Sequence, residues 1–169
     1  MLRACATAYG MRVMSLRYFN VAGAASPELA DTGVFNLVPL VFRAITAGER
    51  PTVFGADYPT PDGTCIRDYV HVCDIADAHL AAARALDGGA LSATYNVGRG
   101  EGSSVLDVLD MIGRVTGRDV THEVAPRRAG DPARVVAAVD RIRDGLGFTA
   151  RHDLQSMVQS AWAGWPDTS

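Results

Sequence analysis

Apolar residues recur every three or four positions in several stretches of this chain, the spacing that puts them on one face of a helix. The stretch behind Ser104 is the clearest, because Ser104 and Asp107 also have the spacing of a capping box. Asn36 and Asp74 are the predicted N-caps of two other helices. We predict helices over residues 2–9, 37–47, 74–86, 105–115, 140–146 and 154–165.

Short apolar runs between these helices are typical of buried strands. We predict strands over residues 12–19, 52–54, 68–72, 94–97 and 120–124. Strands that alternate with helices predict an α/β fold with a partly parallel sheet. These strands are too few for a complete doubly wound sheet, and a missing partner half would explain the shortfall.

Composition narrows the class of protein. Of the 169 residues, 48% are hydrophobic, which is typical of a folded domain. The net charge of −3 is spread without blocks, so we expect no nucleic-acid partner and no polybasic membrane contact. No stretch approaches the roughly 20 apolar residues of a membrane span. All 16 basic side chains belong to arginine, which binds phosphates through a planar fork.

The cysteines indicate a cellular compartment. The three cysteines form no close CxxC pair, so we expect neither a disulfide framework nor a metal site. The first ten residues lack the long apolar run of a signal peptide. These features favour the reducing cytoplasm.

Residues with the chemistry of a phosphate-sugar site stand at strand ends and in loops. Arg67 lies between a Pro/Gly-rich loop and a strand, and Arg128 lies in a loop with Asp131 three residues on. Asn36 opens a helix whose free N–H groups would favour an anion, and Asn20 ends a strand. A diphosphate prefers bidentate donors, and a ribose hydroxyl prefers a carboxylate. The set predicts a site for an anionic sugar ligand.

Each of these residues also has a plainer structural interpretation. An ion pair of Arg67 with Asp62 or Asp68 is the alternative to ligand binding. Arg128 and Asp131 can form a solvated loop pair, and the two asparagines can serve as a helix cap and a turn residue alone.

Three further features are expected to be structural. His79 shares a helix face with Ile75 and is expected to be a packed histidine. Cys65 is expected to fill a small space, since no histidine is near enough in the pattern to activate it. The alternating glycines of Gly98–Gly102 do not satisfy GxGxxG, so we predict a tight turn there.

Several stretches together have the pattern of one enzyme family. They are LRYFNVAGA (16–24), FNLVPLV (35–41), VFGADYPTPDGTCIRDYVHVCDIADAH (53–79), YNVGRGEGSSVLDV (95–108) and PRRAGDPA (126–133). With them the chain resembles the C-terminal half of bacterial UDP-glucose 4-epimerases, members of the extended short-chain dehydrogenase/reductase group. DYPTPDGTCIRDYVHV is more specific to the epimerases than LRYFN or YNVG, which the wider group shares.

The resemblance implies a fold and a division into domains. The fold is the C-terminal part of an NAD-binding Rossmann-like extended SDR fold plus the small α/β substrate-binding domain. Residues 1–20 would be the end of the Rossmann-like domain, a helix tail and a strand. Residues 21–169 would be mainly the UDP-sugar domain, with about 74–100 packing back on the Rossmann-like sheet.

The resemblance also assigns roles in the first part of the chain. Tyr18 and Phe19 would lie by the nicotinamide end of a bound NAD. Asn20 would contact the sugar nucleotide. Asn36 and Leu37 would meet the diphosphate at a helix start.

The remaining implied contacts with the UDP-sugar come from later positions. Arg67 would bind the diphosphate, and Arg128 and Asp131 would bind the diphosphate and the ribose. The residue that limits sugar size would fall near Val135. The strand beside the uracil would be formed by Thr52, Val53 and Phe54.

The catalytic chemistry of that family is absent from these residues. Such epimerases hold NAD, and the tyrosine of a YxxxK motif takes a proton from the sugar while hydride passes to NAD. The chain has no lysine and no glycine-rich dinucleotide loop, so we assign no catalytic residue in it. We expect the chain to be inactive alone, to depend on a missing N-terminal half or a separate chain, and to be a homodimer when complete.

Two other functions stay open. One is another nucleotide-sugar enzyme, such as a dehydratase or decarboxylase, although the DGTCIRDY loop favours an epimerase. The other is a stand-alone or split-chain UDP-sugar-binding module without catalysis. The product of a completed enzyme tests the first alternative. Micromolar binding of UDP by the chain alone would favour the second, whereas we expect little binding because members of the family hold their substrate between two halves.

Overall fold

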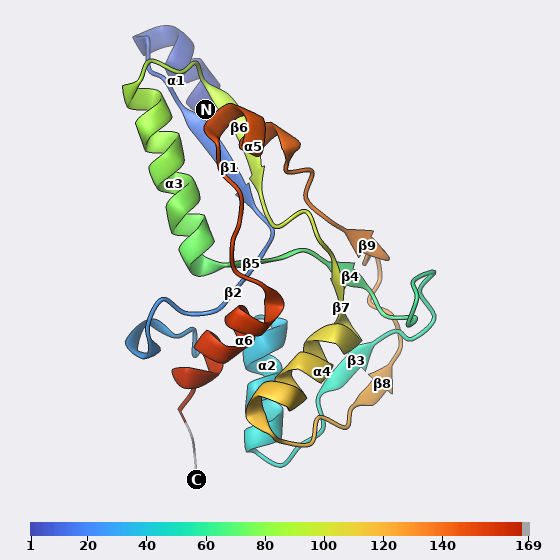
Figure 1. Ribbon diagram of the computed structural model, residues 1–169. Helices are drawn as coiled ribbons and strands as arrows, with labels where there is room; N and C mark the ends of the chain where they lie inside the picture. The colour runs from blue at the N-terminus through green and yellow to red at the C-terminus, as the bar shows by residue number, and fades with distance from the viewer. Residues whose placement is uncertain (167–169) are drawn as a thin grey trace.

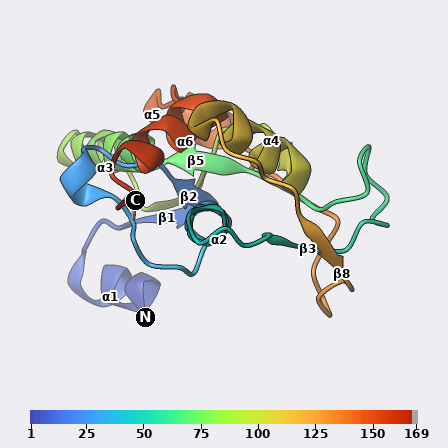
Figure 2. The same ribbon diagram turned by 90° about the horizontal axis from the view of Figure 1, so that it is seen from below.

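The structure, a computed structural model, describes residues 1–166 (Figure 1). The central strands lie between α1 (Leu2–Tyr9) and a group of four helices, as the view from below shows (Figure 2). On one side are α3 (Val72–Asp87), α4 (Val105–Thr116), α5 (Asp140–Leu146) and α6 (Leu154–Ala163). On the other side is α1. Helix α2 (Leu37–Thr46) packs directly against α4 and α6, and the short 3-10 helix η1 (Pro27–Leu29) packs against α6.

Two parallel strand pairs run through the middle of the molecule. They are β1 (Met14–Tyr18) with β6 (Ala93–Val97), and β2 (Asn20–Ala22) with β5 (Tyr69–His71). The predicted strand 12–19 therefore ends at Tyr18, and the chain changes partner at Phe19. The N–H of Phe19 donates to Val97, whereas the N–H of Asn20 donates to Asp68.

Shorter strands form the outer part of the molecule. They are β3 (Thr52–Phe54) with β8 (Glu123–Ala125), and β4 (Ile66–Arg67) between β7 (Ser103–Ser104) and β9 (Arg134–Val135). The predicted strand 120–124 begins later than expected. Asp119 accepts hydrogen bonds from the N–H and hydroxyl of Thr121 at 3.0 and 2.8 Å, and this turn delays the strand.

The carboxylate of Asp68 lies where these strands part. It is fully buried and accepts the N–H groups of Arg99, Gly100 and Ala137 at 2.8, 2.9 and 3.1 Å. A Cβ on Gly98 would come within 2.7 Å of this carboxylate, which explains a glycine there. Asp68 therefore fixes the predicted tight turn 98–102 and the segment that follows β9.

Hydrophobic side chains form two buried clusters, and successive residues of β5 enter different ones. One cluster joins α2, α4 and α6 and consists of Val38, Val41, Phe42, Ile45, Val53, Tyr69, Val108, Leu109, Ile112, Met157 and Val158. The other joins β6, α3 and α5 and consists of Val70, Ile75, Ala78, Tyr95, Val97, Ile142 and Phe148. The proposed division at residue 20 stays a prediction.

The start of α3 differs from the sequence prediction. His71, not Asp74, is the N-cap, and its Nδ1 accepts the N–H of Cys73 at 3.0 Å. Asp74 lies in the first turn, fully buried, and accepts the N–H groups of Arg151 and His152, each at 3.1 Å. Asp74 was therefore wrongly predicted as a cap because its partners are distant in sequence.

Other helix ends follow the sequence more closely. Ser104 and Asp107 form the predicted capping box at the start of α4. The last helix ends at Ala163, so Trp165 lies beyond it. Trp165 still packs on the core, with its ring 5.5 Å from that of Phe42.

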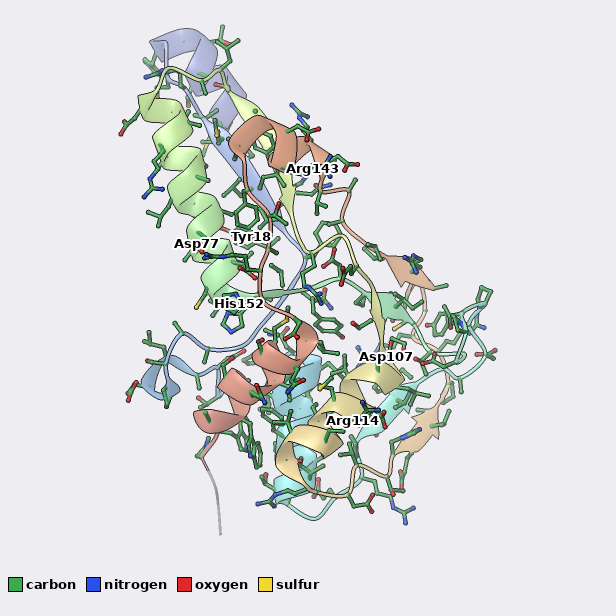
Figure 3. All side chains as sticks on the ribbon, in the orientation of Figure 1. Tyr18, Asp77, Asp107, Arg114, Arg143 and His152 are labelled. Carbon is green, nitrogen blue, oxygen red and sulfur yellow. The ribbon has the colours of Figure 1, made fainter. Side chains whose placement is uncertain are left out.

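His71 also connects α3 to α6. It is 3% exposed, and its Nε2 lies 2.9 Å from Oγ of Ser160, which accepts the N–H of Ala24 and donates to Met157. Since Nδ1 accepts from a backbone N–H, the neutral ring carries its proton on Nε2. Burial and the stacked ring of His152, 4.3 Å away and labelled in Figure 3, lower the pKa of His71.

Acid is expected to destabilise the fold through His71. Below about pH 6.5 the unfolded chain protonates this histidine, whereas the folded chain does so only at lower pH. With respect to this histidine, the free energy of unfolding is therefore at its full value above that pH. It falls as the pH drops toward the lowered pKa of His71 in the folded state. Urea unfolding followed by tryptophan fluorescence between about pH 7.5 and 5.5 measures it. His71→Gln should flatten the decline and His122→Gln should not; equal slopes would contradict the assignment.

Loss of the Asp68 carboxylate is expected to cost about 2–3 kcal/mol, because Asp68→Asn directs an amide N–H₂ at backbone donors. Denaturant unfolding of the variant measures this loss. The control is Asp110→Asn, since Asp110 is 69% exposed in an ion pair with Arg114. Equal stability of the two variants would show that Asp68 does not organise the fold.

Candidate functional site

A cleft of about 550 Å³ opens between the start of α2, strands β3 and β4, and the loop 126–132. All but one of the predicted substrate-binding residues line it, namely Asn20, Asn36, Leu37, Thr52, Phe54, Arg67, Arg128 and Asp131. The exception is Val53, a core residue that is 1% exposed overall, so neither its side chain nor its backbone is open to a ligand. Residues from five separate parts of the sequence thus meet at one cleft.

Arg67 does not have the partner that the sequence suggested. Its Nη2 pairs with Oδ1 of Asp131, and its Nη1 donates to the carbonyl of Ile66 at 2.7 Å. The alternatives Asp62 and Asp68 are occupied elsewhere: Asp62 accepts from Ser104 and Thr64, and Asp68 accepts backbone N–H groups. Arg67 is therefore held at the wall of the cleft by the acidic residue of a distant loop.

The two neighbouring arginines of the 126–132 loop have different surroundings. The guanidinium of Arg128 lies 3.9 Å from the ring centre of Phe54, as a cation on an aromatic face. Arg127 instead lies over Tyr58 and pairs with Asp57 at 2.6 Å. Arg128 thus faces the cleft, whereas Arg127 joins two surface loops. Asp131 forms its ion pair with Arg67 and not with Arg128, so the alternative of a solvated Arg128–Asp131 loop pair is wrong.

The start of α2 is open toward the cleft. Asn36 is the N-cap as predicted, but its side chain makes no capping hydrogen bond and instead approaches Asp31 at 3.5 Å. The first N–H groups of α2 therefore carry no side-chain cap, unlike those of α4, which Ser104 and Asp107 close. Such a helix start favours an anion.

Tyr69 is a residue of the cleft that the sequence prediction missed. It lines the cleft beside Asn20 and is 6% exposed. Burial raises the pKa of Tyr69 to about 12, despite a hydrogen bond with the Asn20 side chain, so the phenol stays neutral. A second cavity of about 190 Å³ shares Asn20, Asn36, Leu37 and Tyr69 with the cleft. In the sequence, only the alternating direction of side chains along β5 could have suggested that Tyr69 faces the cleft.

Tyr18 and Phe19 lie outside this cleft, at the C-terminal end of β1. Tyr18 is 48% exposed, and Figure 3 shows it beside α3. Its hydroxyl lies 2.7 Å from Nε2 of His79, whose Nδ1 lies 2.8 Å from the carbonyl of Ile75. The carbonyl can only accept, so Nδ1 of the neutral ring donates to it. Nε2 then accepts a hydrogen bond from the hydroxyl of Tyr18. His79, predicted to be merely packed, therefore orients Tyr18.

Other site types find less support within residues 1–166. Cys65 is buried as predicted, and burial raises the pKa of its thiol. Over this described range no group of His, Cys, Asp and Glu side chains is arranged to hold a metal ion. No helix in the same range has the length and apolar character to cross a membrane.

Comparison with known proteins gives one family over most of the chain. A model described as the NAD dependent epimerase/dehydratase family matches residues 1–98. The UDP-glucose 4-epimerase of Corynebacterium glutamicum is 45% identical over 161 residues, which cover 94% of this chain and 49% of that protein. The chain therefore spans about half the length of the curated relatives it matches.

Solved structures agree with the sequence matches. UDP-glucose 4-epimerase from Brucella ovis in complex with NAD has a TM-score of 0.89 at 38% identity, covering 97% of this chain and 53% of that one. The Bifidobacterium longum enzyme in complex with NAD+ and UDP has a TM-score of 0.83 at 34% identity, covering 96% and 50%. The predicted α/β fold with parallel strands is confirmed. The chain belongs to the NAD dependent epimerase/dehydratase family.

Proposed function

We propose that the chain is the UDP-sugar-binding half of a UDP-glucose 4-epimerase, which interconverts UDP-glucose and UDP-galactose through a 4-keto intermediate with bound NAD. The observation that carries this proposal is the meeting of Arg67, Arg128, Asp131 and the open start of α2 at one cleft. Two cations, free helix N–H groups and a carboxylate are the groups that a nucleoside diphosphate needs.

Each part of the nucleotide has a candidate partner in this cleft. Arg67, Arg128 and the start of α2 bind the diphosphate, and Asp131 accepts hydroxyl protons of the ribose. The uracil lies along Thr52–Phe54, where backbone groups of β3 recognise its edge. Asn20 contacts the sugar end, next to the smaller cavity. With the diphosphate fixed, the sugar keeps the freedom to turn over that epimerisation requires.

One residue of β9 bears on the size of the sugar. Val135 belongs to β9 and pairs in register with Arg67 on β4. It is 36% exposed and lies next to Arg67 on the neighbouring strand, although it is not one of the residues that line the cleft. We propose that this position sets whether an N-acetylated sugar enters.

NAD would supply a hydride acceptor that later returns the hydride to the sugar. The C-terminal ends of parallel strands β1 and β6 and the exposed ring of Tyr18 suit one end of such a cofactor. Tyr18 and Phe19 are the residues of this chain that we assign to it. The glycine-rich loop and the YxxxK tyrosine would come from an N-terminal half, on the same or a separate chain. The complete enzyme is proposed to be a cytoplasmic homodimer.

A hybrid protein tests the catalytic part of the proposal. The N-terminal half of the Corynebacterium glutamicum relative, joined to this chain, is expected to convert UDP-galactose to UDP-glucose in a coupled assay. The 169-residue chain alone is expected to give no turnover, because it has no YxxxK lysine. Turnover by the chain alone, or a folded hybrid that binds UDP but makes a dehydrated or decarboxylated product, would contradict the assignment.

Substitution of Arg67 tests the binding part. In the hybrid, Arg67→Gln should weaken UDP binding by at least about tenfold, or about 1.4 kcal/mol, since a charged bidentate contact is lost. Isothermal titration at two salt concentrations measures both affinity and its salt dependence. Arg114→Gln is the matched control, because Arg114 is 72% exposed on α4 in a surface ion pair. Equal affinities of the two variants would remove Arg67 from the site.

A further inference from the structure

Two oppositely charged residues in the wall of the cleft, Arg67 and Asp131, are paired with each other in the ligand-free chain. The Arg67 side chain is 14% exposed and the Asp131 side chain 28%, and Arg67 also donates to the carbonyl of Ile66. The N–H of Asp131 donates to the carbonyl of Arg128 at 3.3 Å, which closes the loop around the pair. Arg67 is therefore already satisfied before any anion arrives.

We propose that Asp131 is a specificity-determining residue, which withholds Arg67 from simple phosphates and releases it to a ligand that brings hydroxyl donors together with its diphosphate. The inference rests on the proposed function, because it concerns how the same cleft selects a nucleoside diphosphate. The Arg67–Asp131 ion pair then has a role in the free protein, because it controls which anions gain access to Arg67. Contact of the two residues with a bound nucleotide would not by itself require the pair.

The reason is the fate of the displaced carboxylate. An anion that takes Arg67 leaves Asp131 partly buried and without its cation, which is costly. Pyrophosphate offers acceptors and negative charge, so it repels the freed carboxylate and cannot repay that cost. A ribose diol offers two O–H donors, which can replace the arginine as partners of Asp131. Only a ligand with both groups leaves every charged atom of the pair satisfied.

The neighbouring arginine pair provides an internal comparison. Arg127 also forms an ion pair with an acidic residue, Asp57, but that pair lies against Tyr58 outside the cleft. Removal of either carboxylate changes the net charge by the same amount. Any effect specific to Asp131 therefore separates the proposed selection from a general change in protein charge.

The first experiment compares variants of the full 169-residue chain by titration with pyrophosphate and with UDP, followed by amide chemical shifts. Asp131→Asn is expected to bind pyrophosphate about tenfold more tightly than the unchanged chain, while its preference for UDP over pyrophosphate falls. Asp57→Asn is expected to change pyrophosphate affinity by less than about twofold. Unchanged or weaker pyrophosphate binding by Asp131→Asn, or an equal gain in both variants, overturns the inference.

A second experiment needs no variant and so does not depend on the folding of Asp131→Asn. Saturating uridine should tighten pyrophosphate binding to the unchanged chain by several-fold, because its diol occupies Asp131 and frees Arg67. The dideoxy analogue, 2′,3′-dideoxyuridine, should not. Equal effects of the two nucleosides overturn the inference. A gain in pyrophosphate affinity for Asp131→Asn without any UDP binding by either protein instead counts against the proposed function.

Discussion

The buried carboxylate of Asp68 is the point at which the separate pieces of this structure meet. It accepts hydrogen bonds from backbone N–H groups of the turn after β6 and of the segment after β9. The backbone carbonyl of Asp68 also accepts the N–H of Asn20. Since strand residues alternate in direction, the fixed position of Asp68 also orients its neighbours. Arg67 faces the cleft and Tyr69 enters the core beneath it. The geometry of the cleft thus depends on a residue that is fully buried and does not line it.

The two arginines assigned to the cleft, Arg67 and Arg128, already have partners in the ligand-free chain. Arg67 and Asp131 form an ion pair, and Arg128 lies on the ring of Phe54. Both arrangements keep the cationic side chains ordered at the cleft wall, which reduces the entropy that binding must remove. Under the proposed function, an incoming nucleotide would exchange partners with groups that are already in position. The open start of α2 adds an anion-favouring field that this exchange leaves unchanged.

Local sequence patterns predicted local structure well and distant partners poorly. The capping box of Ser104 and Asp107 lies within one turn of α4, so its spacing alone identified it. The cap of α3 was missed because histidine is rarely an N-cap. The partners of the buried Asp74 lie near residue 151, far away in the sequence. Strands of two residues, such as β7 and β9, are too short for any periodicity.

The candidate site shows the same limit. Its members were proposed from their chemistry and from resemblance, yet the ion pair of Arg67 with Asp131 joins residues 64 positions apart.

Titration of the 15N-labelled chain with UDP, followed by amide shifts, tests most directly whether the cleft is a nucleotide site. The account predicts weak but saturating shifts at the residues that line it, including Asn36, Phe54 and Arg67. Shifts that gather on α1 and β6, or that never saturate at any residue, would contradict it.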